Sequence, residues 1–202
     1  NQYCSGLVFI DCMSNSGEYV DDDGKQVFGT PVRVAKYLRN VAGQYPYKRI
    51  DLFFSDLCAA RTEHLKGLMP NESRNFHIHI TTEDGNELAK RLGQTMSNNK
   101  HYLLVYDPFE ATIDWNAIIP FINNWSEVIL NHMVSDSMRA VKMVKKYAAR
   151  SKYEQTYLTD LENLIPYGSD KTAYEKRVEE IIKALHRNKS RQYYICLLYT
   201  SD

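Results

Sequence analysis

The chain has 202 residues, and its 25 Lys and Arg residues balance 25 Asp and Glu residues, so the formal net charge is zero. This balance excludes histone-like and ribosomal types of protein, which hold nucleic acid by their bulk charge. It also excludes a disordered acidic chain, because 44% of the residues are hydrophobic and 12% are aromatic. The length is sufficient for a full hydrophobic core, and we expect a single domain over 1–202.

The sequence contains no run of about 18 apolar residues that would predict a transmembrane helix, and it does not open with the basic and apolar segments of a signal peptide. The four cysteines lie far apart without a CxxC pair, so we expect no structural zinc site. Cys12, Cys58 and Cys196 lie in or beside apolar runs. This placement favours buried, reduced thiols in a cytoplasmic protein.

Short apolar runs alternate five times with amphipathic stretches in the first 150 residues. The apolar runs predict strands at 6–11, 50–54, 76–80, 102–106 and 128–130. The predicted helices begin at Thr30, as N-cap before Pro31, and then cover 57–68, 83–92, 115–122 and 136–150. Because parallel strands need crossover connections, this order predicts an α/β fold with a parallel sheet between two helical layers. Ligands of such sheets bind beyond the carboxyl ends of the strands.

The pattern changes after residue 150. Residues 151–191 read as helical apart from a break at 166–169, and 192–200 read as an apolar strand. We therefore expect a helical insertion over 151–191 before a terminal strand at 192–200. An apolar strand needs a paired neighbour, and this one lies two residues from the end of a sequence that does not begin with Met. We expect that the sequence is a fragment and that the last strand of the sheet is missing.

Small and acidic residues follow the first three predicted strands. The loop at 11–17 is built of small residues, among which Asn15 and Gly17 tolerate positive φ. Asp56 is placed to accept both hydroxyls of a ribose, or else to cap the next helix. Asp84, in the segment after the third strand, is placed to receive an adenine amino group.

The fourth and fifth predicted strands end in Asp107-Pro108-Phe109 and in Asn131-His132. The carboxylate of Asp107 can accept an N–H of a planar amine while the ring of Phe109 stacks on that amine. Asp-Pro is also a common turn, and this reading stays open. His77 and His79 share one face of the third strand, which suits a metal ion or a half-buried strand face.

The chain contains one acidic and one basic segment, although its formal net charge is zero. The acidic run at 18–23 lacks the spacing of a calcium-binding EF-hand and predicts a solvated loop. Residues 137–152 carry six bases and no acid, with apolar residues at helical spacing between them. Such a helix can follow phosphates, dock an acidic partner, or present a solvated face. The bases are Arg139, Lys142, Lys145, Lys146, Arg150 and Lys152.

These positions together resemble the three-Cys-motif partner (TcmP) family, a prokaryotic and phage family with a class I methyltransferase-like, Rossmann-like fold. The resemblance covers about residues 6–140, and 192–200 also looks like the sixth strand of that fold. No single motif is specific, but the set occurs in order. Its members are Asp11 to Tyr19, Gly29-Thr30-Pro31, Asp56 with Arg61 and Leu65, Asp84-Gly85-Asn86, Asp107-Pro108-Phe109, and Asn131 with Arg139.

The resemblance implies an S-adenosylmethionine site and an amino-group methyltransferase. The methionine part would lie at the loop with Asp11, Ser14, Asn15 and Gly17, the ribose at Asp56, and the adenine at Asp84 and Asn86. Asp107, Pro108 and Phe109 would form the catalytic element, and no metal is implied. Family members are typically encoded beside a three-cysteine, radical-SAM-like protein, which is the implied partner. Asn131, Arg139, Lys142, Lys145 and Lys146 are the candidate contacts to substrate, nucleic acid or partner.

The sequence departs from the family pattern in two places. The family loop is usually Phe-Ala-Gly-x-Gly, where this chain has 13–17 as Met-Ser-Asn-Ser-Gly, so the Asn15 side chain is expected to crowd the cofactor. One proline precedes the aromatic residue, where amino-methyltransferases usually carry two.

The residues and the resemblance together leave three hypotheses for the function. The first is methyl transfer to an amino nitrogen of a nucleic-acid base, and the second is a non-catalytic module that docks the partner or nucleic acid. The third is a metal-dependent nuclease built on Asp11, Asp56 and Asp107.

Overall fold

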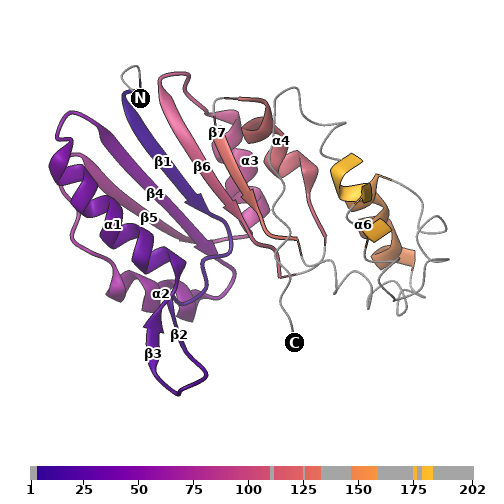
Figure 1. Ribbon diagram of the computed structural model, residues 1–202, viewed down its shortest axis with the longest axis horizontal. Coiled ribbons are helices and arrows are strands. Elements are labelled where there is room, and N and C mark those ends of the chain that lie inside the picture. Colours follow the sequence, from indigo (N-terminus) through magenta and orange to yellow (C-terminus); the bar gives the residue numbers. More distant parts are fainter. Residues whose placement is uncertain are drawn as a thin grey trace.

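The computed structural model describes residues 4–109, 112–124, 126–132, 147–158, 175–176 and 179–183. A parallel five-stranded sheet forms the centre of the protein (Figure 1). Its strands lie in the order β5-β4-β1-β6-β7. They are β1 (Gly6–Asp11), β4 (Arg49–Asp56), β5 (Phe76–Thr82), β6 (Lys100–Tyr106) and β7 (Ser126–Leu130). The five strands predicted from the apolar runs are all present, and the predicted parallel pairing is confirmed.

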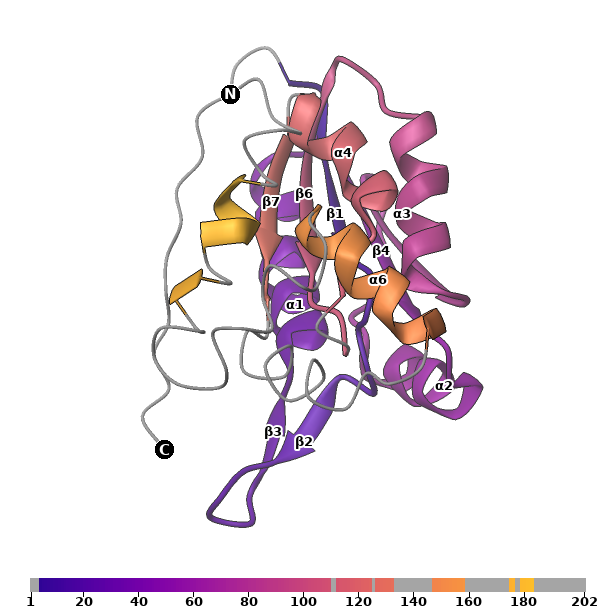
Figure 2. The same ribbon diagram turned by 90° about the vertical axis from the view of Figure 1, so that its right-hand side faces the viewer.

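The order of the strands reverses once. The chain runs from β1 through β4 to β5 at one edge and then returns to β6 on the other side of β1. Right-handed crossovers put the helices of these two halves on opposite faces of the sheet. The helices are α1 (Thr30–Gln44) and α2 (Ala59–Leu68) in the first half, and α3 (Gly85–Gln94) and α4 (Trp115–Asn123) in the second. The fold is thus Rossmann-like, with helices on both faces (Figures 1 and 2).

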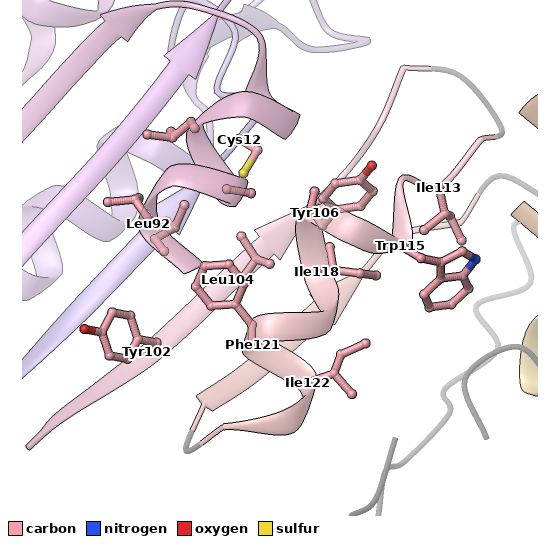
Figure 3. Close-up of a cluster of buried hydrophobic side chains, with 14 of the residues drawn as sticks. Cys12, Leu92, Tyr102, Leu104, Tyr106, Ile113, Trp115, Ile118, Phe121 and Ile122 are labelled. Atoms are coloured by element: carbon pink, nitrogen blue, oxygen red, sulfur yellow. The ribbon is translucent and has the colours of Figure 1, made fainter. Parts of the chain in front are cut away.

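Alternate residues of the central strands β4, β1 and β6 contribute to two hydrophobic cores. Phe9 of β1 packs with Val32 of α1 and Leu65 of α2 on one face. Its neighbours Val8 and Ile10 point to the other face, where residues of α3 and α4 cover them. Figure 3 shows this second core, in which aromatic residues of β6 and α4 lie side by side. Both faces of β1 are buried, which is why its sequence reads as one continuous apolar run.

Local capping corrects three predicted helix starts. Gly29, rather than Thr30, is the N-cap of α1 and makes no side-chain bond there. Asp84 caps α3 by accepting a hydrogen bond from the Asn86 N–H, so this helix begins at Gly85 and not at residue 83. The helix predicted over 57–68 begins at Ala59 instead, and Leu57 precedes it with 73% of its surface exposed.

The acidic segment at 18–23 is not a loop alone. β2 (Glu18–Val20) and β3 (Gln26–Phe28) form an antiparallel hairpin that projects from the body of the protein (Figure 1). The Asp21 carboxylate accepts the N–H groups of Asp23 and Lys25 and so closes the turn. A hydrogen bond of 2.6 Å between Glu18 Oε1 and His64 Nε2 of α2 joins the hairpin to the body.

The helix α6 (Tyr147–Tyr157) crosses residue 150, where the sequence suggested the end of one helix and the start of an insertion. The backbone N–H of Ile113 and the indole N–H of Trp115 both donate to Thr156, so α6 is attached to the start of α4. Most of the predicted insertion and the terminal strand at 192–200 lie outside the described residues. No described helix is both long and apolar enough for a membrane span.

Candidate functional site

A cavity of about 940 Å³ opens beyond the carboxyl ends of the strands. This volume lies at the upper end of the range of about 300–1,000 Å³ that is usual for small-molecule sites. Residues that follow β1, β4, β5 and β6 form its floor, and the start of α4 together with α6 forms a wall. The cavity thus lies where the strand order reverses, which is the usual ligand site of a doubly wound sheet.

Asp56 ends β4 on the floor of this cavity and is 4% exposed. Its Oδ1 accepts the N–H of Cys58 at 2.8 Å, while its Oδ2 has no hydrogen-bond partner among the described residues. Arg61 Nη1 lies 3.6 Å from Oδ2 and balances the charge. Cys58, and not Asp56, caps α2. A buried carboxylate oxygen without a hydrogen-bond donor costs free energy, and the nearby positive charge of Arg61 offsets this cost.

Asp84 and Asn86 lie together at the start of α3 and both line the cavity. Asp84 is the helix cap as well as a lining residue. The Asn86 side chain is held by Tyr106, whose hydroxyl group lies 2.7 Å from Asn86 Oδ1. The two predicted adenine contacts are therefore brought into the same cavity as Asp56.

The loop at 11–17 contributes less to the cavity than the sequence suggested. Asn15 and Gly17 do adopt positive φ angles, of 55° and 83°. However, only Cys12 and Met13 of the loop line the cavity, and the Asn15 side chain is exposed, with Oδ1 accepting the Ser16 N–H. Ser14 is buried and donates to the Ser55 carbonyl. The expected crowding of the cavity by Asn15 is therefore absent.

Asp11 ends β1 directly before the lining residue Cys12 and is 5% exposed. Burial raises the pKa of its carboxyl group to about 7, and the negative charge of Asp107 adds to this shift. The N–H of Met13 lowers the pKa in part by donating to the carboxylate. Asp11 therefore carries a proton over much of the acidic range, which is unusual for an aspartate.

The Asp107-Pro108-Phe109 element follows β6 at the mouth of the cavity. Pro108 and Phe109 line the cavity, and the Phe109 ring is 62% exposed. Asp107 is exposed and is not a lining residue; its Oδ1 accepts a hydrogen bond of 2.9 Å from Asn131 Nδ2. The structure therefore joins Asn131 to Asp107 and separates both from the cavity lining.

The structure describes some of the basic residues at 137–152 that were predicted to contact a partner or nucleic acid. Arg139, Lys142, Lys145 and Lys146 lie outside the described residues. Of the same basic segment, Arg150 pairs with Glu154, and Lys152 lines the cavity from α6. The cavity wall that α6 supplies was not predicted, because nothing in its sequence reports that it packs on α4.

The third hypothesis, a metal-dependent nuclease, is not supported by the described part of the chain. Within it, no three His, Cys, Asp or Glu side chains lie close enough together to hold a metal ion. Asp11, Asp56 and Asp107 end three strands but do not converge. His77 and His79 likewise gain no third ligand there, and His79 stacks on Phe53 with ring centroids 4.5 Å apart.

Several lining residues were missed by sequence reasoning. Tyr106 was assigned only to a strand, and Cys58 was expected to be buried but is exposed at the cavity. Gly85 allows the start of α3 to approach Cys12 closely, since a Cβ at residue 85 would lie 2.1 Å from the Cys12 carbonyl oxygen. A signal for Gly85 existed, because it stands between two polar residues at a strand end.

No family model matches the chain, and no curated protein matches it. Among solved structures, one match is a protein of Legionella pneumophila whose family model is DUF519. It is 13% identical, with a TM-score of 0.36 over 89% of this chain. The chain spans 66% of the length of that protein, which is less than two thirds. The fold assignment rests on the strand order and register of this chain itself.

Proposed function

We propose that the cavity binds S-adenosylmethionine and that the protein transfers its methyl group to an amino nitrogen, such as that of a nucleic-acid base. The observation that carries this proposal is the Asp56 carboxylate, which ends β4 among the residues that line the cavity and whose buried Oδ2 has no hydrogen-bond donor among the described residues. In Rossmann-like sheets, a carboxylate at the end of this strand accepts hydrogen bonds from the hydroxyl groups of a ribose. When bound, the cofactor supplies an electrophilic methyl group on a sulfonium.

The protein's own residues hold and orient the two reactants. Asp56 accepts the ribose hydroxyls, while Asp84 and Asn86 meet the adenine at the next strand end. Phe109 offers an exposed ring at the mouth, on which a planar amine can stack. Methyl transfer needs little acid–base assistance, because alignment of the nitrogen with the methyl group supplies much of the rate. A base within a duplex must be flipped out to reach this depth.

A second candidate is a non-catalytic module that docks a three-cysteine, radical-SAM-like protein or nucleic acid. The position of Asp107 favours it, because this carboxylate is outside the cavity lining and is already bonded to Asn131. In this case the contacts come from the basic segment with Arg139, Lys142, Lys145 and Lys146. Charge reversal of the three lysines would then abolish partner binding in a pull-down while leaving cofactor affinity unchanged.

Titration calorimetry with S-adenosylmethionine and S-adenosylhomocysteine tests the first candidate. Asp56→Asn keeps the shape of the side chain but removes its charge, so we expect affinity to fall by about tenfold to a hundredfold. Asp22→Asn, in the exposed turn of the hairpin, makes the same charge change away from the cavity and serves as the control. Absence of binding by the unmodified chain would refute the proposal, as would equal affinity of the Asp56 variant.

A further inference from the structure

A buried tyrosine connects the starts of α3 and α4 at the cavity. Tyr106 is 1% exposed and ends β6, next to Cys12 and the segment that leads from Ile113 into α4 (Figure 3). Its hydroxyl group lies 2.7 Å from Asn86 Oδ1 and 3.1 Å from the backbone nitrogen of Asp114. The phenol oxygen of Tyr106 makes both contacts. Because it carries a single hydrogen, it can donate in only one of them.

The direction of the two hydrogen bonds follows from their chemistry. A backbone N–H is only a donor, so the Asp114 N–H donates to the phenol oxygen. The phenol hydrogen is then available for the other partner and is donated to Asn86 Oδ1. Burial raises the pKa of Tyr106 to about 12, so the hydroxyl group keeps this hydrogen at neutral pH. The Asn86 amide is thereby held by its oxygen, and no hydrogen bond among the described residues takes up its NH2 group, so this donor is available to a ligand in the cavity that Asn86 lines.

The neighbouring Asp84 carboxylate is a hydrogen-bond acceptor, whereas the Asn86 NH2 group is a donor. Asp84 Oδ1 accepts the Asn86 backbone N–H at 2.7 Å, and the carboxylate can accept further hydrogen bonds. Asp84 and Asn86 line the same cavity two residues apart, at the start of one helix. The wall therefore presents a hydrogen-bond acceptor beside a donor whose orientation Tyr106 determines.

We propose that Tyr106, by orienting Asn86 beside Asp84, makes the cavity selective for 6-aminopurines over 6-oxopurines. Adenine offers an amino donor next to a ring-nitrogen acceptor, which complements Asp84 and Asn86. Guanine and hypoxanthine carry an oxygen at position 6 instead of the amino group. This oxygen is an acceptor, so it cannot form a hydrogen bond with the Asp84 carboxylate. Tyr106 is thus a positioning residue. The inference rests on nucleotide binding in this cavity, as in the proposed function, but it does not require methyl transfer.

Paired titrations of adenosine and inosine test this selectivity in the intact chain, because these nucleosides differ mainly at the 6-position. We expect adenosine to bind about ten to a hundred times more tightly than inosine. Asn86→Asp replaces the donor by an acceptor of the same size, so the preference should fall to nearly one. Asn71→Asp makes the same change at an exposed residue outside this cavity and should keep the full preference.

Tyr106→Phe removes the hydroxyl group that holds the Asn86 amide and keeps the ring, so it should also reduce the preference. A merely structural loss would weaken both nucleosides equally and leave their ratio unchanged, so the ratio is the readout. If this variant does not fold by circular dichroism, the Asn86→Asp result decides alone.

The outcomes separate this inference from the proposed function. Equal binding of adenosine and inosine, together with tight binding of S-adenosylhomocysteine, overturns the inference alone. A clear adenosine preference without binding of S-adenosylmethionine overturns the proposed function and supports the inference. Absence of binding by any of these ligands overturns both.

Discussion

Asp11 and Asp56 end neighbouring strands with buried carboxylates whose surroundings differ. Asp56 receives the Cys58 N–H and lies near the Arg61 guanidinium. Among the described residues, Asp11 receives a 3.2 Å hydrogen bond from the Met13 N–H and is acted on by the charge of Asp107. The Asp11 carboxyl group therefore keeps a proton to a higher pH than a free aspartate, because burial and the charge of Asp107 disfavour its ionised form and raise its pKa.

Asp11→Asn should change the pH dependence of stability. The folded pKa is raised from 3.8 to about 7, so the protonated carboxyl group stabilises the fold fully below about pH 4. This contribution of Asp11 to stability is lost as the pH rises through 7. The Asn side chain of the variant stays neutral, so the stability of the variant does not fall in this way. We expect the Tm of Asp11→Asn, relative to the unmodified chain, to increase between pH 5 and pH 8 in thermal melts. A difference in Tm that stays constant with pH would contradict the assignment.

At the scale of elements, the contact between α3 and the end of β1 positions the cavity floor. Gly85 is the first residue of α3 and is buried against Cys12. Without this close approach, Asp84 and Asn86 could not stand beside the residues that follow β1. The hairpin β2–β3 is the opposite case, because its exposed Tyr19 and Val20 leave it joined to the body by few contacts.

Gly85→Ala should destabilise the protein, because the new Cβ would lie 2.1 Å from a backbone oxygen that cannot rotate away. We expect a loss of about 1–3 kcal/mol or more in the free energy of unfolding, measured by urea denaturation. Gly67→Ala in α2 is the matched control, since a Cβ there meets nothing within 4 Å. It should stabilise by about 0.5–1 kcal/mol. Equal effects of the two substitutions would show that α3 does not press on β1.

For the whole molecule, the sheet divides the interior into two cores that share the same strands. Leu52 belongs to the core under α1 and α2, and Leu104 belongs to the core under α3 and α4. Both side chains are fully buried. Because every central strand contributes to both cores, neither core can open without breaking the sheet, and unfolding should be cooperative.

Leu52→Ala and Leu104→Ala should each lower the free energy of unfolding by about 2–5 kcal/mol and keep a single transition. Leu57→Ala, at a side chain that is 73% exposed, should change it by less than about 0.5 kcal/mol. Urea titrations followed by tryptophan fluorescence and by circular dichroism measure this. Two separated transitions in either buried variant would mean that the cores unfold independently.

Much of the fold was predictable because burial leaves a direct record in sequence. Strands covered on both faces must be apolar throughout, so 6–11 and 50–54 were identified within a few residues. The hairpin escaped prediction because its faces are exposed and its pattern is acidic. Thr30 was taken as a cap because its residue type suits one, but the backbone places Gly29 there instead.

By itself, the sequence determined the alternation of strands and helices, the parallel sheet, and the set of polar residues at its carboxyl edge. Only the tertiary structure decided which of those residues share a cavity. Asp56, Asp84, Asn86 and Phe109 face it, whereas Asp107 and Asn15 do not. It also made Tyr106 part of a hydrogen-bond network and brought α6 to the cavity wall. The reason is physical: local periodicity reports which side chains are buried, while direction and contact depend on segments that are distant along the chain.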